Sequence, residues 1–203
     1  MPAMVTFPLA GTGGTLAEFC VQALRRITTL MFSAALDAGQ WRQVLAGISA
    51  GAGGVPVHVI GHDRASGLYP GHLVHGYDPR AVRLFAEHYH DRSPWMANVM
   101  AEPPGRAIPC GLMCPDDAVE RTAFYADVVR PHDDIIGGGG AVLARSAGTV
   151  FKIGGSVPRR HRDRLEPALI DLLNLLIGAL TQAWALSRTL AAALAALAAL
   201  ATP

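Results

Sequence analysis

Cysteine is scarce in this sequence. Only three of the 203 residues are cysteines, Cys20, Cys110 and Cys114, and the N-terminus lacks the basic and then apolar pattern of a secretory signal peptide. These two absences argue against a disulfide-stabilised secreted scaffold. We therefore expect reduced thiols and a cytoplasmic protein.

An excess of charge of either sign is also missing. Seventeen basic and 16 acidic residues give a formal net charge of +1, and charged residues make up 16% of the chain. The basic cluster from Arg159 to Arg164 is too small for a broad basic face, so direct binding of nucleic acid by this chain is not expected. A hydrophobic fraction of 51% instead indicates a well-buried core that can enclose a small ligand.

Glycine and proline are nearly absent from the last part of the chain. Between Arg162 and Leu200 the only exceptions are Pro167 and Gly178, which predicts one long helix. Leucines in its first half follow the spacing of a broad apolar stripe that packs on a core. These leucines are Leu165, Leu169, Leu172, Leu173, Leu176 and Leu180.

The second half of this helix carries a narrower seam with steps of four and three residues. The seam consists of Leu176, Leu180, Ala183, Leu190, Leu194, Leu197 and Ala201, interrupted at Ser187. Such a seam suits a partner helix in a coiled coil, so we expect a homodimer through the C-terminal helix. An alanine-rich helix that frays, or that continues into further sequence, is the alternative.

A membrane-spanning segment is a competing interpretation of the same helix. Residues 168–186 are apolar over about the 20 residues that cross a bilayer. However, Asp171, Asn174 and Gln182 lie within that stretch, and an aspartate near the bilayer centre is costly. We therefore expect no membrane insertion.

The preceding segments alternate helices with pairs of strands, apart from a Pro-rich segment over 101–115 that is expected to be extended or looped. Hairpins in place of crossovers predict an antiparallel sheet with helices packed against it, an α+β fold. The predicted helices cover 15–34, 41–48, 79–92 and 116–130, and the predicted hairpins cover 55–75 and 137–156.

Three motifs follow one another along the chain. They are Ala35-Leu-Asp-Ala-Gly-Gln-Trp41, His88-Tyr-His-Asp-Arg-Ser-Pro-Trp95 and Glu120-Arg-Thr-Ala-Phe-Tyr-Ala-Asp-Val-Val-Arg-Pro131. Together with the second hairpin and the Leu-rich closing helix, they make residues 15–200 similar to the N-terminal sensory region of bacterial LuxR-type helix-turn-helix regulators.

This resemblance implies a PAS- or GAF-like sensory domain over 15–160, after a flexible leader over 1–14 and before a dimerisation and signalling helix over 161–203. It also implies a regulator without catalytic activity. The sequence departs from the family pattern at Ser93, where an aspartate is usual, and at His132-Asp-Asp-Ile-Ile, which follows Arg-Pro. The helix-turn-helix is absent before Pro203, so we expect either the sensory part of a regulator or a stand-alone relative.

Aromatic residues are the best candidates for a ligand pocket, since they supply contact area and polar groups. We predict a pocket between the sheet and the two middle helices for a small hydrophobic or aromatic ligand, with the glycine run 137–140 keeping side chains out of it. The same aromatic residues would look alike as ordinary core. The candidate ligand-binding residues are Tyr89, Trp95, Phe124, Tyr125, His58, His132 and Gly139.

A haem protein that uses the same pocket is the alternative function, with His88, His90 or Cys114 as the axial ligand. No other cofactor is expected. A metal site is not predicted, because His88 and His90 point about 200° apart on a helix and Cys110 and Cys114 lack further zinc ligands nearby. No nucleophile and base pattern appears, so we expect no enzyme. A scaffold that only associates through its helix is the third interpretation.

Overall fold

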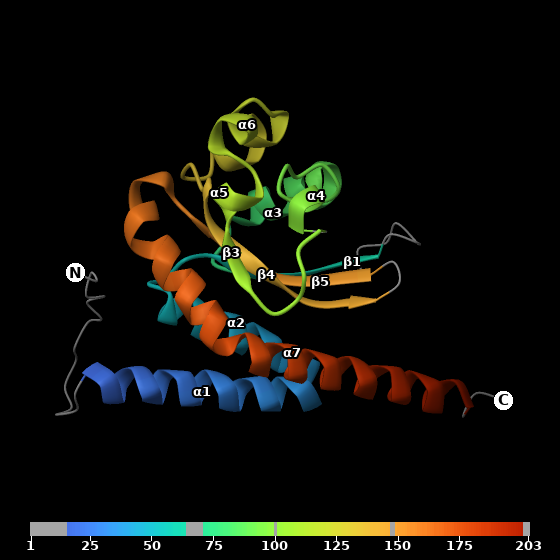
Figure 1. The fold of residues 1–203 in the computed structure, drawn as a ribbon. Coiled ribbons are helices and arrows are strands. Elements are labelled where there is room, and N and C mark those ends of the chain that lie inside the picture. Colours follow the sequence, from blue (N-terminus) through green and yellow to red (C-terminus); the bar gives the residue numbers. More distant parts are fainter. Residues whose placement is uncertain (1–15, 64–70, 100, 147–148, 201–203) are drawn as a thin grey trace.

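A five-stranded antiparallel sheet lies at the centre of the protein (Figure 1). The computed structural model describes residues 16–63, 71–99, 101–146 and 149–200. Along the sheet the strands follow the order β2-β1-β5-β4-β3. The strands are β1 (Val57–Asp63), β2 (Gly71–His75), β3 (Ala107–Pro109), β4 (Gly137–Ser146) and β5 (Thr149–Val157).

Three helices cover one face of the sheet and enclose the main hydrophobic core. These helices are α1 (Leu16–Leu36), α2 (Trp41–Gly51) and α7 (Arg162–Leu200). A short turn, η1 (Ala38–Gln40), separates α1 from α2, and the Asp37 carboxylate caps it by accepting a hydrogen bond from the Gly39 amide at 3.0 Å. Trp41 of α2 then packs edge-to-face on Trp184 of α7, with ring centroids 5.0 Å apart.

Short helical elements cover the opposite face, and we call them the roof (Figure 1). Asp78 begins the roof, because its carboxylate accepts a hydrogen bond from the Arg80 amide at 2.7 Å while Pro79 occupies the first helical turn. The elements of the roof are α3 (Pro79–Leu84), η2 (Phe85–Tyr89), α4 (Met96–Val99), α5 (Cys110–Met113), α6 (Asp116–Glu120) and η3 (Tyr125–Val129).

The apolar stripe predicted on the C-terminal helix is confirmed. Leu169, Leu173, Leu176 and Leu180 of α7 are at most 2% exposed and lie in the main core. Each leucine buried in this way contributes about 1.5–3 kcal/mol to folding. After a short turn, η4 (Arg159–His161), α7 therefore docks on the sheet through its first half.

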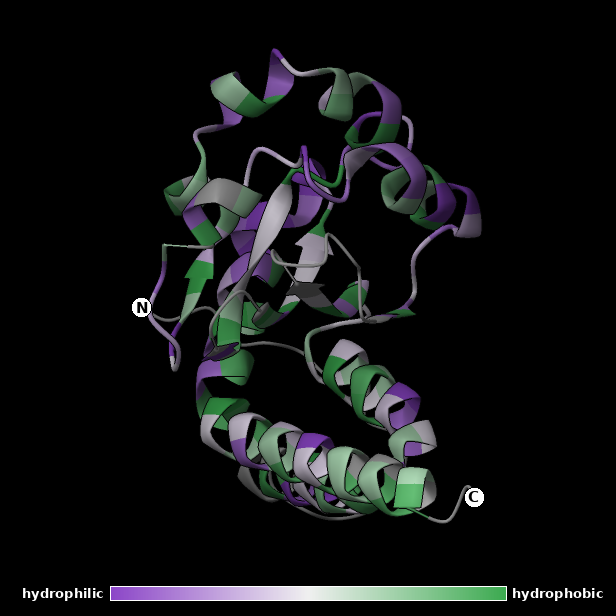
Figure 2. Cartoon of the chain, turned by 90° about the vertical axis from the view of Figure 1, so that its right-hand side faces the viewer, coloured by the Kyte–Doolittle hydropathy of each residue, from purple (hydrophilic) through white to green (hydrophobic). Residues whose placement is uncertain are grey.

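The second half of α7 leaves the domain. Leu194, Leu197 and Leu200 are 57%, 62% and 84% exposed, and Figure 2 shows apolar residues continuing to the end of the helix. Within the described part of the chain, one helix, spanning Arg159–Leu194, is long and apolar enough to cross a membrane by length and composition. Leu169, Leu173, Leu176 and Leu180 of this helix lie in the main hydrophobic core.

The α+β class, the antiparallel sheet and the flanking helices are as predicted, and most of the Pro-rich segment is extended or looped as expected. That segment also holds two elements that the sequence did not predict, the edge strand β3, where Pro109 pairs with Gly139, and the short helix α5. An edge strand tolerates proline because one side of it needs no partner. The two middle helices are also broken, since each changes into a π-helical turn, η2 or η3. The predicted leader and both hairpin turns lie outside the described residues.

Candidate ligand-binding site

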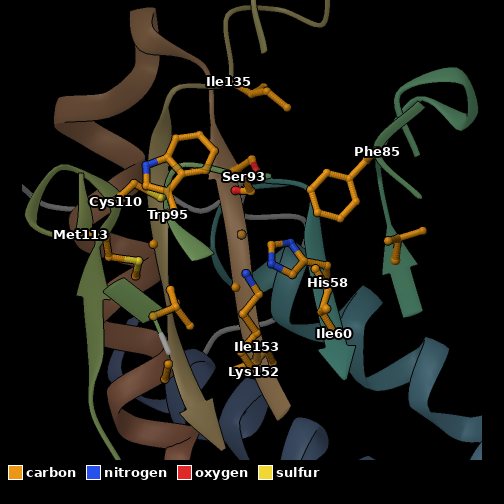
Figure 3. Close-up of a pocket in the computed structure, with 18 of the residues that line it drawn as sticks. His58, Ile60, Phe85, Ser93, Trp95, Cys110, Met113, Ile135, Lys152 and Ile153 are labelled. Carbon is orange, nitrogen blue, oxygen red and sulfur yellow. The ribbon is translucent and has the colours of Figure 1, made fainter. Parts of the chain in front are cut away.

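A cavity of about 120 Å³ lies between the sheet and the roof (Figure 3). It approaches the size of a cavity of about 150 Å³ that is known to bind benzene. Apolar side chains from both layers make up most of its wall, including Ile60, Val142 and Val74 below and Phe85 and Met113 above. Such a space fits a small organic molecule.

Two rows of residues that run across the sheet form the floor of the cavity. Strand pairing sets the register of each row, and alternate residues of a strand share a face, so both rows face the roof. The first row is Val74, His58, Gly154, Gly140 and Ile108, and the second row is His72, Ile60, Lys152 and Val142.

Glycines keep the middle of the first row open. Gly140 pairs with Gly154, and a Cβ atom on Gly154 would stand 2.9 Å from His58 Nε2. The absence of a side chain at Gly154 therefore leaves room for the His58 ring. Gly139 acts on the other face, because a Cβ atom there would stand 2.3 Å from the Ile108 carbonyl oxygen of β3 and 2.6 Å from Ile170 Cδ1 of α7. Its absence lets α7 approach the sheet.

An aromatic cluster forms the ceiling. Phe124 is 5% exposed and lies at the centre of the cluster, with ring centroids 5.5 Å from Tyr89, 5.6 Å from Trp95 and 6.1 Å from Phe85. The indole nitrogen of Trp95 is buried and has no hydrogen-bond partner among the described residues. Phe124 is thus part of the hydrophobic core of the roof and also part of the cavity wall. The two interpretations of these aromatic residues, pocket lining and ordinary core, therefore both apply to it.

A hydrogen-bonded chain of three side chains fixes His58. Its Nδ1 lies 2.8 Å from the Tyr77 hydroxyl oxygen, which lies 2.9 Å from Ser156 Oγ. Burial lowers the pKa of His58 well below its usual value, and the nearby Lys152 and His72 lower it further. Burial also raises the pKa of Tyr77. At neutral pH this chain consists of uncharged groups.

Lys152 brings a positive charge to the cavity floor. It points from β5 into the cavity next to His58, with Phe85 and Trp95 above (Figure 3). No side chain or carbonyl of the described residues forms a hydrogen bond or an ion pair with it. Burial accordingly lowers the pKa of Lys152 to about 8. At pH 7 the amine is still mainly an ammonium ion.

His72 and the Cys110 thiol, which also line the cavity, are neutral at pH 7. Burial is the main cause that lowers the pKa of His72 to about 4, and Lys152 adds to it. Burial raises the pKa of the Cys110 thiol to about 12, with Glu166 as the next cause. Arg106 and Glu102 also line the cavity. The cavity floor therefore combines apolar side chains and neutral hydrogen-bonding groups with the ammonium ion of Lys152.

The predicted site residues fall into two groups. His58, Trp95, Phe124 and Gly139 line the cavity. Tyr89, Tyr125 and His132 do not line it, and they lie behind its ceiling. There Tyr89 donates a hydrogen bond to Asp127, Tyr125 packs in the roof cluster, and His132 Nδ1 lies 2.8 Å from the Val128 carbonyl oxygen.

The candidate haem ligands lie away from the cavity. His88 is exposed beside Glu87, His90 is half-buried, and Cys114 packs at the edge of the roof cluster. None of the three lines the cavity. Across the described ranges, no group of three His, Cys, Asp or Glu side chains is placed to hold a metal ion.

Sequence reasoning missed the most polar part of the floor, formed by Lys152, His72, Tyr77 and Ser156. One signal was present, since Lys152 is the only lysine in the sequence and all other basic residues counted in the net charge are arginines. It also interrupts an otherwise apolar strand. The partners of His58 come from distant segments and could not be paired without the fold.

Comparisons with known proteins support the fold. No protein-family model matches the sequence, and no curated protein is significantly similar to it. A similar solved structure is the crystal structure of the VqsR LBD domain from Pseudomonas aeruginosa, with a TM-score of 0.57 and 15% sequence identity. The match covers 84% of this chain and 96% of that ligand-binding domain. At this identity the similarity establishes the shared fold.

Proposed function

We propose that this chain is the small-molecule-sensing domain of a LuxR-type transcriptional regulator and has no catalytic activity. The observation that carries the proposal is the cavity between sheet and roof, which has an apolar wall and a few convergent polar groups, as ligand pockets do. The fold supports it, because VqsR is a LuxR-type regulator and the matched part is its ligand-binding domain. We expect the protein in the cytoplasm.

The first turns of α7 connect the cavity to the signalling helix. Arg162 donates to Asp116 of the roof at 2.5 Å and to Glu166 of its own helix at 3.2 Å. Glu166 in turn accepts a hydrogen bond from the Gly138 amide of β4 at 2.7 Å. A ligand that moves the roof or β4 would therefore act on α7 directly, which supports α7 as the output element.

The exposed leucines of α7 support a homodimer in this proposal. Among them, Leu194 and Leu197 belong to the predicted coiled-coil seam and are more than half exposed. Phe32 and Leu36, near the end of α1, are also exposed, at 55% and 71%. A second copy that pairs along α7 would cover the seam and place two cavities in one assembly.

A cavity-filling variant tests the site. Val74→Phe adds bulk on the cavity face of the edge strand β2, whereas His75→Phe adds the same ring at the next position, on the opposite face. We expect small apolar or aromatic compounds to raise the melting temperature of the parent and of His75→Phe. A compound at a hundred times its Kd stabilises by about 2.7 kcal/mol. Val74→Phe should show little of this effect.

Two outcomes would contradict the proposed site. If Val74→Phe responds to the same compounds as the parent, the ligand binds elsewhere. If no compound stabilises any of the three proteins, the scaffold interpretation is favoured. The haem alternative is separated by the visible absorption spectrum of the protein as purified, because a Soret band requires bound haem.

A further inference from the structure

The ammonium group of Lys152 lacks compensation. An ammonium ion that is partly removed from water is costly unless an anion or several hydrogen bonds replace its hydration. Among the described residues no carboxylate forms an ion pair with Lys152, and Glu102, which also lines the cavity, is not within ion-pair distance. Among the described residues the cavity therefore presents a positive charge without an anionic partner, which an anionic ligand can supply.

His58 offers a second polar contact beside this charge. Its Nδ1 is occupied by Tyr77, whereas its Nε2 lies over Gly154 and has no hydrogen-bond partner within the described part of the chain. If the Tyr77 hydroxyl donates to Nδ1, then Nε2 carries the proton and donates into the cavity. An oxygen atom bound there would select this tautomer and be held by a neutral donor next to the ammonium ion.

The charge of the site limits the charge of the ligand that it can bind. Lys152 is a single compact cation, and His58 and His72 are neutral donors or acceptors at pH 7. Arg106 also lines the cavity, but its side chain is exposed. Dianions such as phosphate monoesters are usually held by several cations or by a bidentate arginine. One ammonium ion with neutral donors suits a monoanion, and the apolar wall suits a hydrocarbon body.

We propose that the ligand sensed by this domain is an apolar monocarboxylic acid, bound with its carboxylate between Lys152 and His58 and its hydrocarbon part among Ile60, Val142 and Phe85. This inference rests on the proposed sensing function and adds the ligand class to it. The cavity volume of about 120 Å³ suits an acid with one aromatic ring or a short flexible chain.

The sequence makes the test direct, because Lys152 is the only lysine. Protein grown with lysine labelled with ¹³C at Cε gives one lysine side-chain signal, which reports this amine alone. The probes are phenylacetate and octanoate, and the controls are phenylacetamide and octanamide, which have the same shape without the charge. We expect the acids to shift the Lys152 signal and to bind at least tenfold more tightly than the amides at pH 7.

Substitution and pH supply the controls. In Lys152→Met the preference for acid over amide should fall below about twofold, and in His75→Phe it should persist. Binding of the acids by the parent should weaken as pH rises above about 8, where Lys152 loses its proton. His58, His72, Tyr77 and Cys110 stay neutral from pH 7 to 9, and the Lys152→Met comparison removes any contribution of Glu102 and Arg106.

Each other outcome overturns the carboxylate proposal in a recognisable way. If the amides bind as well as the acids and Val74→Phe abolishes both, the sensing function stands and the ligand class is wrong. If borohydride fixes a carbonyl compound to Lys152 as a secondary amine, the lysine is a covalent anchor and not an ion-pair partner. If neither acid shifts the Lys152 signal, the proposal fails, whatever else binds.

Discussion

A single side chain, Lys152, gives the cavity its electrostatic character. Its nearest neighbours across the strands are Ile60 and Val142, so apolar groups surround the stem of the lysine. Functional sites commonly retain such locally unfavourable groups, because the stability that they cost is recovered only when the ligand binds. Lys152 should therefore destabilise the ligand-free protein.

Replacing this lysine should stabilise the empty domain. Lys152→Met keeps the length of the side chain and removes the charge, so we expect the free energy of unfolding at pH 7 to rise by about 1–3 kcal/mol. The folded pKa of about 8 lies below the unfolded value of about 10.4. The parent therefore regains stability relative to the variant as pH rises from 8 to 10.4. The part of the difference in unfolding free energy that comes from the charge should vanish near pH 10.4.

Urea unfolding of both proteins across this pH range measures the effect. Above pH 9 the buried Cys110 thiol acts in the opposite direction, because its folded pKa of about 12 exceeds the unfolded value and stability falls as the unfolded thiol ionises. Because Lys152 and Cys110 also act on each other's pKa, this loss differs between parent and variant. The comparison is therefore read between pH 7 and 9, where the difference in stability should already shrink. A variant that is less stable than the parent at pH 7 would show that Lys152 has a partner in the folded state.

The sequence allowed part of this site to be predicted. Trp95 and Phe124 were found because aromatic residues near the ends of two helices favour a pocket wall. Lys152 was missed, because a lysine in a strand is usually on the solvent face and nothing local indicates which face of the hairpin is covered. The side on which Gly139 acts was equally hidden, since it depends on where α7 lies.

Among the secondary-structure elements, the start of α7 is fixed by ion pairs of Arg159 and Arg162 with carboxylates. Arg159 donates to Asp134 at 2.6 Å and to Glu120 at 2.7 Å, and Arg162 joins Asp116 to Glu166. The basic cluster that gave no nucleic-acid face in the sequence therefore has an internal role. It ties the roof to the helix that leaves the domain.

Breaking this connection should cost more than breaking a similar pair on the surface. The Arg162 side chain is 23% exposed. Burial is the largest single effect on its pKa and lowers it, but Glu166 and Asp116 together raise the pKa above its usual value. We expect Arg162→Met to lower the free energy of unfolding by about 1–3 kcal/mol. The control is Arg121→Met, which removes an ion pair with Asp117 that is 73% and 69% exposed and should change stability by less than about 0.5 kcal/mol.

Denaturant titration of the two variants decides between them. Equal effects would mean that the bridge from roof to α7 is no stronger than a surface ion pair and would remove the proposed route from cavity to helix.

The sequence predicted the long helix and both hairpins from periodicity and turns. It did not predict β3 or the two π-helical turns, since pairing of a three-residue edge strand depends on residues about 30 positions away.

At the scale of the whole molecule, α7 is both part of the core and an exposed arm (Figure 1). Its apolar stripe is buried through Leu180 and Ala183, and its seam is exposed at Leu194 and Leu197. In a monomer the leucine side chains of the seam would remain in contact with water, which is unfavourable. We expect that pairing of two such arms supplies the assembly through which ligand binding is reported.

Charges placed in the seam should separate the dimer. In the heptad defined by the seam, Leu194 and Leu197 face the partner, whereas Ala192 and Ala199 point away from it. We expect the parent to sediment at twice its mass of 21.3 kDa and the double variant Leu194→Glu, Leu197→Glu to sediment as a monomer, because pairing would bury unpaired carboxylates. Ala192→Glu with Ala199→Glu should remain dimeric. A seam variant that stays dimeric places the interface elsewhere.

Native mass spectrometry of the purified protein shows most directly whether a small molecule occupies the cavity between sheet and roof. We expect the parent and His75→Phe to hold one small molecule per chain, as purified or after incubation with small apolar compounds, and to release it on denaturation. Val74→Phe should hold none. A Val74→Phe variant that holds the same mass as the parent would contradict a ligand in this cavity, as would the absence of a bound small molecule from all three proteins under both conditions.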